Sequence, residues 1–229
     1  MAAPTFTPFT EEFHTGGFIV SQANGNMSFA AGVLATTWKL AAGFVLGQIT
    51  IGAVTSAAKG GGNTGNGTWV QDATAPAQAR AKVGIYTLVC VIAATNGGTF
   101  DLVDSNGISI GQYAIAGGAG GTVIVNDQIK GVLTDGSTDF VVGDAFLITV
   151  AAGSGQFAPY DPTAFNGTQN AIGILYQDAD ATNAAQNIAI FQRAGEFNIS
   201  ELLWGTNVTT QAQKNAAYAN FALVNLIGR

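Results

Sequence analysis

The sequence predicts a mainly β protein, and its composition and its pattern of turns are the observations that predict it. Of the 229 residues, 31 are glycines, which are frequent in the turns and bulges of β-rich chains. Short apolar runs recur between glycine- and asparagine-containing turns, and a helical pattern is confined to the C-terminal end. The expected fold is a small β-rich domain with a short C-terminal helix, interrupted by an inserted β-sandwich of immunoglobulin-like size.

The charge of the chain argues against a nucleic-acid partner. Charged residues make up 10% of the sequence against 48% hydrophobic residues, the net charge is −6, and the isoelectric point is near 4.4. No two of the eight lysines and arginines are adjacent, so a basic footprint for phosphate groups is missing. Because so few charges are available to keep the surface soluble, uncharged polar residues must do so, or partners must cover much of the surface.

Further features of the sequence exclude an intrachain disulfide and predict no membrane association. Cys90 is the only cysteine and lies in the apolar run 83–94, so a buried small side chain is expected there. No apolar run approaches the roughly 20 residues that a membrane-spanning helix needs, and the N-terminus lacks the pattern of a signal peptide. Synthesis in a cytoplasm is therefore expected.

Changes in composition along the chain predict its domain organisation. Residues 1–20 contain Pro4, Pro8 and Gly16-Gly17 without a sustained period, which is typical of an extended arm. The glycine-rich segment 57–67 and the small-residue segment 151–155 are interpreted as linkers. Because both linkers join the same host, residues 57–153 are expected to be an inserted β-sandwich, and residues 21–56 and 154–229 to form the host domain.

Short apolar runs and one capping motif predict the individual elements. In the inserted segment, strands are expected at about 85–92, 99–104, 108–113, 122–125, 128–133 and 145–150. In the host, strands are expected at about 18–20, 44–51, 171–176 and 187–192. The capping box Thr210–Gln213 predicts a helix to about Asn225, with apolar positions at Ala216, Ala217, Phe221 and Val224.

A search for catalytic or metal-binding groups yields no active site, and no cofactor is expected. His14 is the only histidine and lies in the expected arm, which argues against histidine-based catalysis or metal binding. The spacing of Asp135, Asp139 and Asp144 does not match a calcium loop, so turn-capping is the preferred interpretation. The pair Asp178 and Asp180 lies in a polar stretch and is interpreted as solvated charge. The chain is therefore expected not to be an enzyme and to hold no metal.

Aromatic residues of the inserted segment allow two interpretations. They could line a sugar-binding face, but aromatic residues in strands more often pack in the core, which is the preferred interpretation. The residues concerned are Trp69, Tyr86, Phe100 and Tyr113.

The C-terminal third of the chain carries four motifs in order: Tyr160-Asp161-Pro162, Ala171-Ile172-Gly173, Gly195-Glu196-Phe197 and Leu202-Leu203-Trp204. In these motifs the chain resembles the head decoration proteins of lambda-like tailed phages. The resemblance covers residues 157–229 and keeps the order and spacing of the family pattern; the segments 13–25 and 40–47 match more loosely. The segment 57–153 departs from the pattern, since the smallest family members lack it. The matching positions, which the resemblance implies serve the fold and the trimer, are Tyr160, Asp161, Pro162, Gly167, Gly173, Glu196, Phe197, Leu203 and Trp204.

The resemblance implies a structural virion protein on the outer surface of a phage capsid. It implies a homotrimer at three-fold and quasi-three-fold positions, which clamps neighbouring major capsid subunits and stabilises the expanded head. It also implies an N-terminal arm that adds a strand to a capsid-protein edge. The residues suited to this are Thr5, Phe6, Thr7, Pro8 and Phe9, with the two phenylalanines as apolar anchors.

The alternative function is that of a surface-displayed adhesin or carbohydrate-binding protein that acts through the inserted β-domain. A host-surface glycan would then be a further partner, and a trimer would multiply a low affinity per site. A hydrolase is disfavoured because no nucleophile–base pair is found. A tail or fibre subunit is a further alternative, and the position of the protein on the virion would distinguish it from a capsid protein.

Overall fold

The chain forms two compact units, each with its own hydrophobic core. The computed structural model describes residues 14–118 and 120–229. Unit 1 comprises the described residues up to Gln48, Gln156–Pro162 and Asn170–Arg229, and unit 2 comprises Ile49–Gly155 and Thr163–Gln169. The prediction of a mainly β fold with one C-terminal helix is confirmed.

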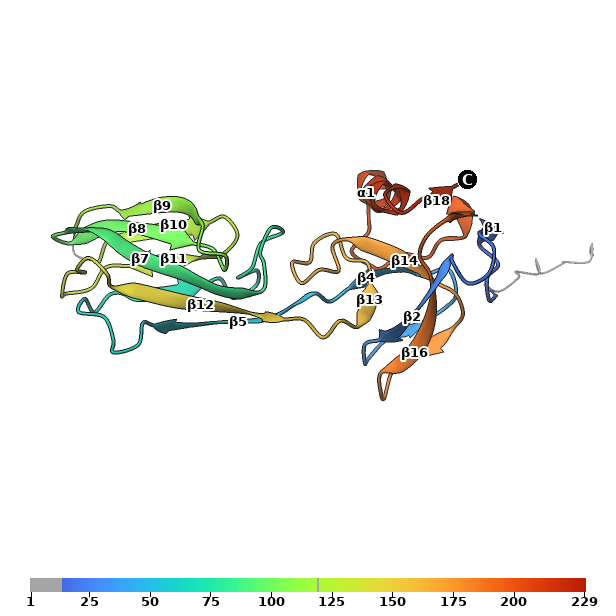
Figure 1. The fold of residues 1–229 in the computed structure, drawn as a ribbon, viewed down its shortest axis with the longest axis horizontal. Helices are drawn as coiled ribbons and strands as arrows, with labels where there is room; N and C mark the ends of the chain where they lie inside the picture. The colour runs from blue at the N-terminus through green and yellow to red at the C-terminus, as the bar shows by residue number, and fades with distance from the viewer. Residues whose placement is uncertain (1–13, 119) are drawn as a thin grey trace, which may run out of the picture. The chain divides into compact units, whose positions relative to one another are not determined.

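Unit 1 is built around a closed five-stranded barrel (Figure 1). Its strands follow the order β13-β2-β16-β14-β4, and all paired neighbours are antiparallel except β13 and β2. Their bounds are β2 Phe29–Leu34, β4 Val45–Gln48, β13 Phe157–Pro159, β14 Ala171–Leu175 and β16 Gln186–Phe191.

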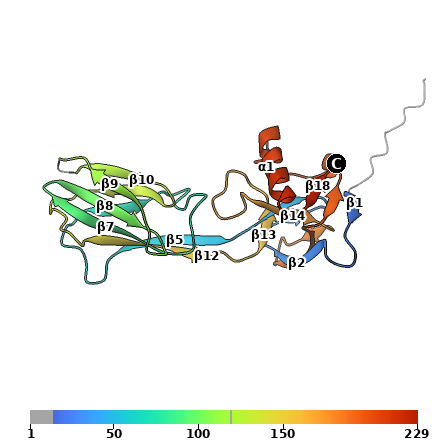
Figure 2. The ribbon, with the colours of Figure 1, turned by 45° about the horizontal axis from the view of Figure 1, so that its top comes forward.

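Two small sheets and one α-helix complete unit 1. One sheet has the order β1-β17-β18, and the other pairs β3 with β15. The helix α1 contacts β14 and β18 within this unit (Figure 2). The bounds are β1 Ile19–Gln22, β3 Lys39–Leu40, β15 Ala179–Asp180, β17 Gly195–Phe197, β18 Leu226–Gly228, α1 Gln211–Ala222 and a 3₁₀ turn η1 Ile199–Glu201.

Unit 2 consists of a five-stranded and a three-stranded sheet, both antiparallel, which enclose one core. The strand orders are β5-β12-β7-β8-β9 and β10-β11-β6. Turns such as Ser105–Gly107, between β8 and β9, lie where the glycine and asparagine pattern predicts them. The bounds are β5 Ile51–Ala58, β6 Thr68–Gln71, β7 Gly84–Ala94, β8 Gly97–Val103, β9 Ser109–Ile115, β10 Thr122–Asn126, β11 Lys130–Thr134 and β12 Ala145–Ala152.

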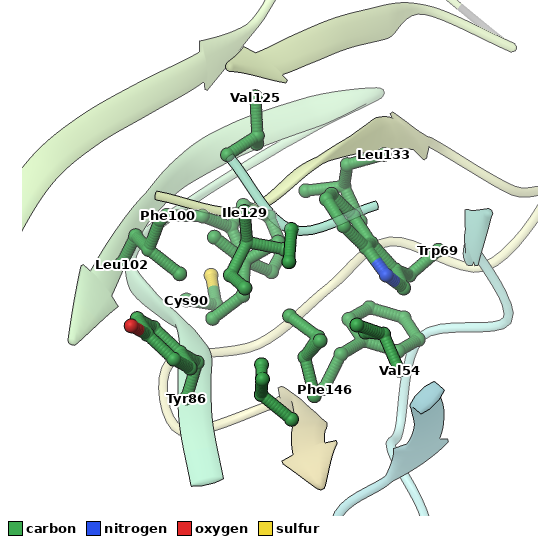
Figure 3. Packing of buried hydrophobic residues seen from close by; sticks show 14 of the residues in the cluster. Val54, Trp69, Tyr86, Cys90, Phe100, Leu102, Val125, Ile129, Leu133 and Phe146 are labelled. Atoms are coloured by element: carbon green, nitrogen blue, oxygen red, sulfur yellow. The ribbon is translucent and has the colours of Figure 1, made fainter. Parts of the chain in front are cut away.

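Large aromatic and aliphatic side chains fill the core of unit 2 (Figure 3). Cys90 is fully buried there, as the sequence predicts, and burial raises the pKa of its thiol. Trp69, Tyr86 and Phe100 are also buried, and Tyr113 packs partly buried against them. Three of these four residues therefore lie in the core, and Tyr113 packs against it, in line with the preferred interpretation.

The glycine-rich segment predicted as the first linker is part of unit 2. Ala57 and Ala58 are the last residues of β5 and pair with β12. The loop that follows is fixed at its far end, where the backbone N–H groups of Thr64 and Gly65 both donate to Asp144 at 2.9 Å. The composition of the segment 57–67 predicts a flexible linker, whereas the structure shows the end of a strand and an ordered loop. Composition does not reveal this order, because the residue that fixes the loop lies about 80 residues away in the sequence.

The helix begins where the capping box predicts and ends earlier than expected. Thr210 and Gln213 form the reciprocal cap, and α1 ends at Ala222. Asn225 then adopts a left-handed conformation with φ of 57°, which turns the chain into β18. Of the four expected apolar helix positions, Ala217 and Phe221 are buried, whereas Ala216 and Val224 are exposed.

Asp144 is the buried charge that organises one end of unit 2. Burial by itself would raise its pKa, but N–H donors from Gly65, Thr64 and Val141 and the ammonium of Lys59 together lower it to about 2. Since the pKa is depressed in the folded state, its stabilising contribution is present above the ordinary value of 3.8 and is lost as the pH falls toward 2.

We expect Asp144→Asn to lower the free energy of unfolding of unit 2 by about 2 kcal/mol at neutral pH. Urea unfolding between pH 2 and pH 7 measures this, and the difference from the unchanged protein should shrink at the acidic end. Asp127→Asn, which removes a more exposed ion pair with Arg80, is the control and should cost less than about 1 kcal/mol. Equal losses for the two variants would contradict the assignment.

Candidate functional site

Three of the nine family-motif positions, Tyr160, Phe197 and Trp204, meet at α1. Tyr160 is almost fully buried next to β13, and its backbone N–H donates to the carbonyl of Val45 in β4. Its hydroxyl donates to the backbone carbonyl of Gln213 in α1 at 3.2 Å. Burial raises the pKa of this hydroxyl, with nearby Asp161 adding to the effect, so it stays protonated and remains a donor. Tyr160 thus ties the barrel to the helix.

Trp204 lies at the centre of an aromatic group on the same side of the barrel. Its ring packs edge-on against Tyr160 at 6.3 Å and against Tyr218 of α1 at 5.8 Å between centroids. The ammonium of Lys214 lies 5.5 Å from the centroid of the indole, within cation–π range. Through Lys214 and Tyr218, two successive turns of α1 are therefore attached to Trp204.

Phe197 and Glu196 join the two ends of unit 1 through the sheet β1-β17-β18. Phe197 is fully buried and packs against Tyr218 and Phe221 of α1. Glu196 accepts hydrogen bonds from the guanidinium of Arg229 and, at 3.0 Å, from the hydroxyl of Ser21. These donors, Arg229 first, lower the pKa of the Glu196 carboxyl.

Gly173 and Leu203 act through the backbone. A Cβ on Gly173 would lie 2.4 Å from the side chain of Ile190, so only glycine lets β14 pass this close to β16. Leu203 exchanges backbone hydrogen bonds with the chain at the start of β4, donating to Gly43 and accepting from Val45, both at 3.0 Å.

The remaining motif positions do not join the group around the helix. Asp161 accepts a hydrogen bond from the side-chain amide of Asn207 at 2.7 Å, and Pro162 is the last residue before the loop 163–169. Gly167 lies in that loop, which belongs to unit 2, and adopts a φ of 108°. Asn166 of the same loop accepts from the backbone N–H groups of Thr50 and Ile51.

Sequence reasoning missed Tyr218, Lys214 and Arg229. Tyr218 and Lys214 lie four residues apart on α1, a spacing that puts both on one face, where they meet Trp204. That spacing was a usable signal for this pair. Arg229 had no comparable signal, because its partner Glu196 is 33 residues away.

The acidic residues considered for chemistry mostly accept hydrogen bonds or form ion pairs with groups distant in the sequence. Asp139 accepts from the N–H of Asn96, Asp178 from the N–H of Ala42, and Asp180 pairs with Lys39 at 3.2 Å. Asp135 departs from the turn-capping interpretation, because it is buried and neither carboxylate oxygen has a partner among the described residues.

The described part of the chain offers no cluster of metal ligands and no membrane-spanning helix. Within residues 14–118 and 120–229, no group of three or more histidine, cysteine, aspartate or glutamate side chains could hold a metal ion. Among the same residues, no helix has the length and apolar character needed to cross a membrane. The predicted arm residues Thr5 to Phe9 lie outside the described part of the chain.

The class that this geometry defines is a β-rich protein whose motif residues serve packing and helix attachment. Among family models, the one described as bacteriophage lambda head decoration protein D matches residues 8–226. The chain therefore belongs to that family. The family is structural, and its members decorate the phage head. A capsid-surface location and binding to the major capsid protein follow at the family level.

The other comparisons add little. The comparison with curated proteins gave no match. Two crystal structures of Xanthomonas campestris FlgL align with 23% identity and a TM-score of 0.30. They cover 48% and 49% of this chain, but it spans only about a third of each FlgL chain (33% and 32%), and the similarity carries no argument.

The role of Tyr160 can be tested with two graded substitutions. Tyr160→Phe should lower the free energy of unfolding of unit 1 by about 1 kcal/mol, because only the hydrogen bond to α1 is lost. Tyr160→Ala should cost about 3–5 kcal/mol, because the ring is also removed from the core. Urea titrations followed by circular dichroism measure both, and an unchanged Tyr160→Ala variant would refute the assignment.

Proposed function

We propose that the protein binds the outer surface of a tailed-phage capsid as a trimer, at three-fold and quasi-three-fold sites, and stabilises the expanded head. The single observation that carries this proposal is the family match over residues 8–226. The low charge of the chain agrees with it, since a protein outside the shell has no need of basic residues for the packaged genome.

In this proposal, unit 1 is the capsid-binding decoration domain. It contains most of the family-motif positions, and the motif residues Tyr160, Phe197 and Trp204 fix its one helix to the rest of the unit. Unit 2 is proposed to be an inserted domain, close to the predicted bounds 57–153, that a decoration trimer would display in three copies.

The glycan-binding alternative stays a prediction, and its original candidates do not favour it. Trp69, Tyr86 and Phe100 are buried, so they are not available to stack on a sugar. Among the described residues of unit 2, no aromatic side chain is fully exposed. A glycan site on this unit would therefore have to use other side chains.

The capsid proposal is tested with purified protein and expanded capsids that lack it. We expect saturable binding in sets of three at each local three-fold site, and a shell that survives heat or chelator treatment better than bare capsids. Quantitative binding by sedimentation, followed by cryo-electron microscopy of the decorated shell, measures both effects. Absence of binding would overturn the proposal.

The N-terminal arm yields a separate prediction. Deleting residues 2–15 should leave the circular dichroism spectrum and melting temperature unchanged and weaken capsid binding by about a hundredfold or more, because strand addition by the arm is lost. A finer pair of variants is Phe6→Ala with Phe9→Ala against Glu11→Gln with Glu12→Gln. Only the first pair should weaken binding; full affinity of the deletion variant would contradict the arm's role.

A further inference from the structure

Five Asn-Gly pairs lie at turns and loops of the chain, and this dipeptide has a chemistry of its own. The backbone nitrogen that follows an asparagine can attack the carbon of the side-chain amide, and a glycine there offers no Cβ to hinder the attack. The attack requires an amide that is free to rotate and a backbone N–H that is not held in a hydrogen bond. The pairs are Asn24-Gly25, Asn66-Gly67, Asn96-Gly97, Asn106-Gly107 and Asn166-Gly167.

Hydrogen bonds hold both reacting groups of the pair Asn166-Gly167. The side-chain oxygen of Asn166 accepts from the backbone N–H of Thr168 at 3.2 Å and from its hydroxyl at 2.7 Å. The N–H of Gly167 donates to the side-chain oxygen of Gln169 at 2.7 Å. These bonds have to break before the ring can close, so the pair is protected.

One reacting group is held in each of two further pairs. The side chain of Asn66 donates to the hydroxyl of Ser137 and accepts from the N–H of Thr138, both at 2.9 Å. In the pair that begins at Asn106, the glycine N–H donates to the carbonyl of Asp104 at 2.9 Å. Both pairs therefore lose a hydrogen bond when they react.

The pair Asn96-Gly97 is fixed by its place in the hairpin between β7 and β8. The N–H of Asn96 donates to Asp139 at 2.8 Å, and its carbonyl accepts from the N–H of Gly118 at 3.1 Å. Gly97 is buried and pairs with Ala94 across the hairpin. Ring closure at this pair would disturb contacts on both sides of the turn.

The pair Asn24-Gly25 differs from the other four. Both residues are exposed in the turn between β1 and β2. Within the described part of the chain, neither the side chain of Asn24 nor the N–H of Gly25 has a hydrogen-bond partner. A Cβ on Gly25 would meet no atom within 4 Å, so the space around the pair is open. Nothing in this turn opposes the attack.

We propose that Asn24 is a site of spontaneous deamidation, through which the turn gains a carboxylate. The nitrogen of Gly25 gives up its proton and bonds to the side-chain carbon of Asn24. The bond from that carbon to the amide nitrogen breaks, and the nitrogen leaves as ammonia with the proton. Water then opens the cyclic imide at one carbonyl to give aspartate or at the other to give isoaspartate. The reaction involves no oxidation or reduction, and water is the only co-reactant.

The fold of unit 1 should survive this change, because other residues fix the ends of the turn. The N–H of Ala23 donates to the hydroxyl of Ser28 at 2.9 Å and to the carbonyl of Ala194 at 3.1 Å. The hydroxyl of Ser28, which is fully buried, also donates to Ala194 at 2.8 Å. The product is therefore a folded chain with one negative charge added to the net charge of −6.

Incubation of the purified full chain in mildly alkaline buffer tests the proposal. Isoelectric focusing should show a more acidic form that accumulates with time, and mass spectrometry after trypsin digestion should place the change at Asn24. The tryptic peptide that ends at Lys39 contains no other Asn-Gly pair, so the assignment is unambiguous. Asn24 should react at least about tenfold faster than Asn166, whose hydrogen bonds each add about 1 kcal/mol to the barrier.

Matched controls separate the effect of the structure from that of the dipeptide. In concentrated urea the hydrogen bonds are lost, so the five pairs should react at similar rates. Asn24→Gln keeps the exposed amide but cannot form the five-membered ring, and the acidic form should not accumulate. Asn24→Asp, one product of the reaction, should keep the circular dichroism spectrum and the melting temperature of the unchanged protein.

Two results would overturn the proposal. One is a folded chain in which Asn24 reacts no faster than Asn166, and the other is an acidic form that accumulates equally in Asn24→Gln. Both measurements use the free protein, so their outcome is independent of whether the chain binds a capsid.

Discussion

The closure of the small barrel is the constraint on which unit 1 depends. Five short strands enclose a narrow interior, and Ile190 and Phe157 fill it because two facing positions carry no side chain. A Cβ on Gly32 would lie 2.7 Å from both of these side chains, and one on Gly173 would lie 2.4 Å from Ile190. Without glycine at these positions the strands would have to separate, and the outer surface against which α1 packs at β14 would shift with them.

The helix attachment follows from that closure. Tyr160 leaves β13 at the barrel and binds α1, and Trp204 follows the segment that exchanges hydrogen bonds with the chain beside β4. Both residues are therefore positioned by backbone pairing before their side chains meet the helix. This explains why family-motif positions far apart in the sequence serve one packing arrangement.

The sequence could predict what is local and could not predict what is held by distant partners. The capping box at Thr210 placed the start of α1 correctly, and the turns of unit 2 lay at glycine and asparagine as expected. The loop 59–67 was misjudged because its order comes from Asp144, at the start of β12. Strand β2 (Phe29–Leu34) was missed because its small residues lack the apolar pattern of a strand; pairing with β16 stabilises it.

In the candidate site, too, contacts between residues distant in the sequence could not be predicted. The resemblance identified Glu196 and Trp204, but their partners Arg229 and Lys214 emerge only when the chain is folded. Most of the few charges are fixed by such contacts. Asp104, for example, is buried and accepts from the N–H groups of Asn106 and Ile108 while pairing with Lys82 at 3.1 Å. A chain with 10% charged residues thus uses charges to hold turns, and leaves apolar side chains on its surface.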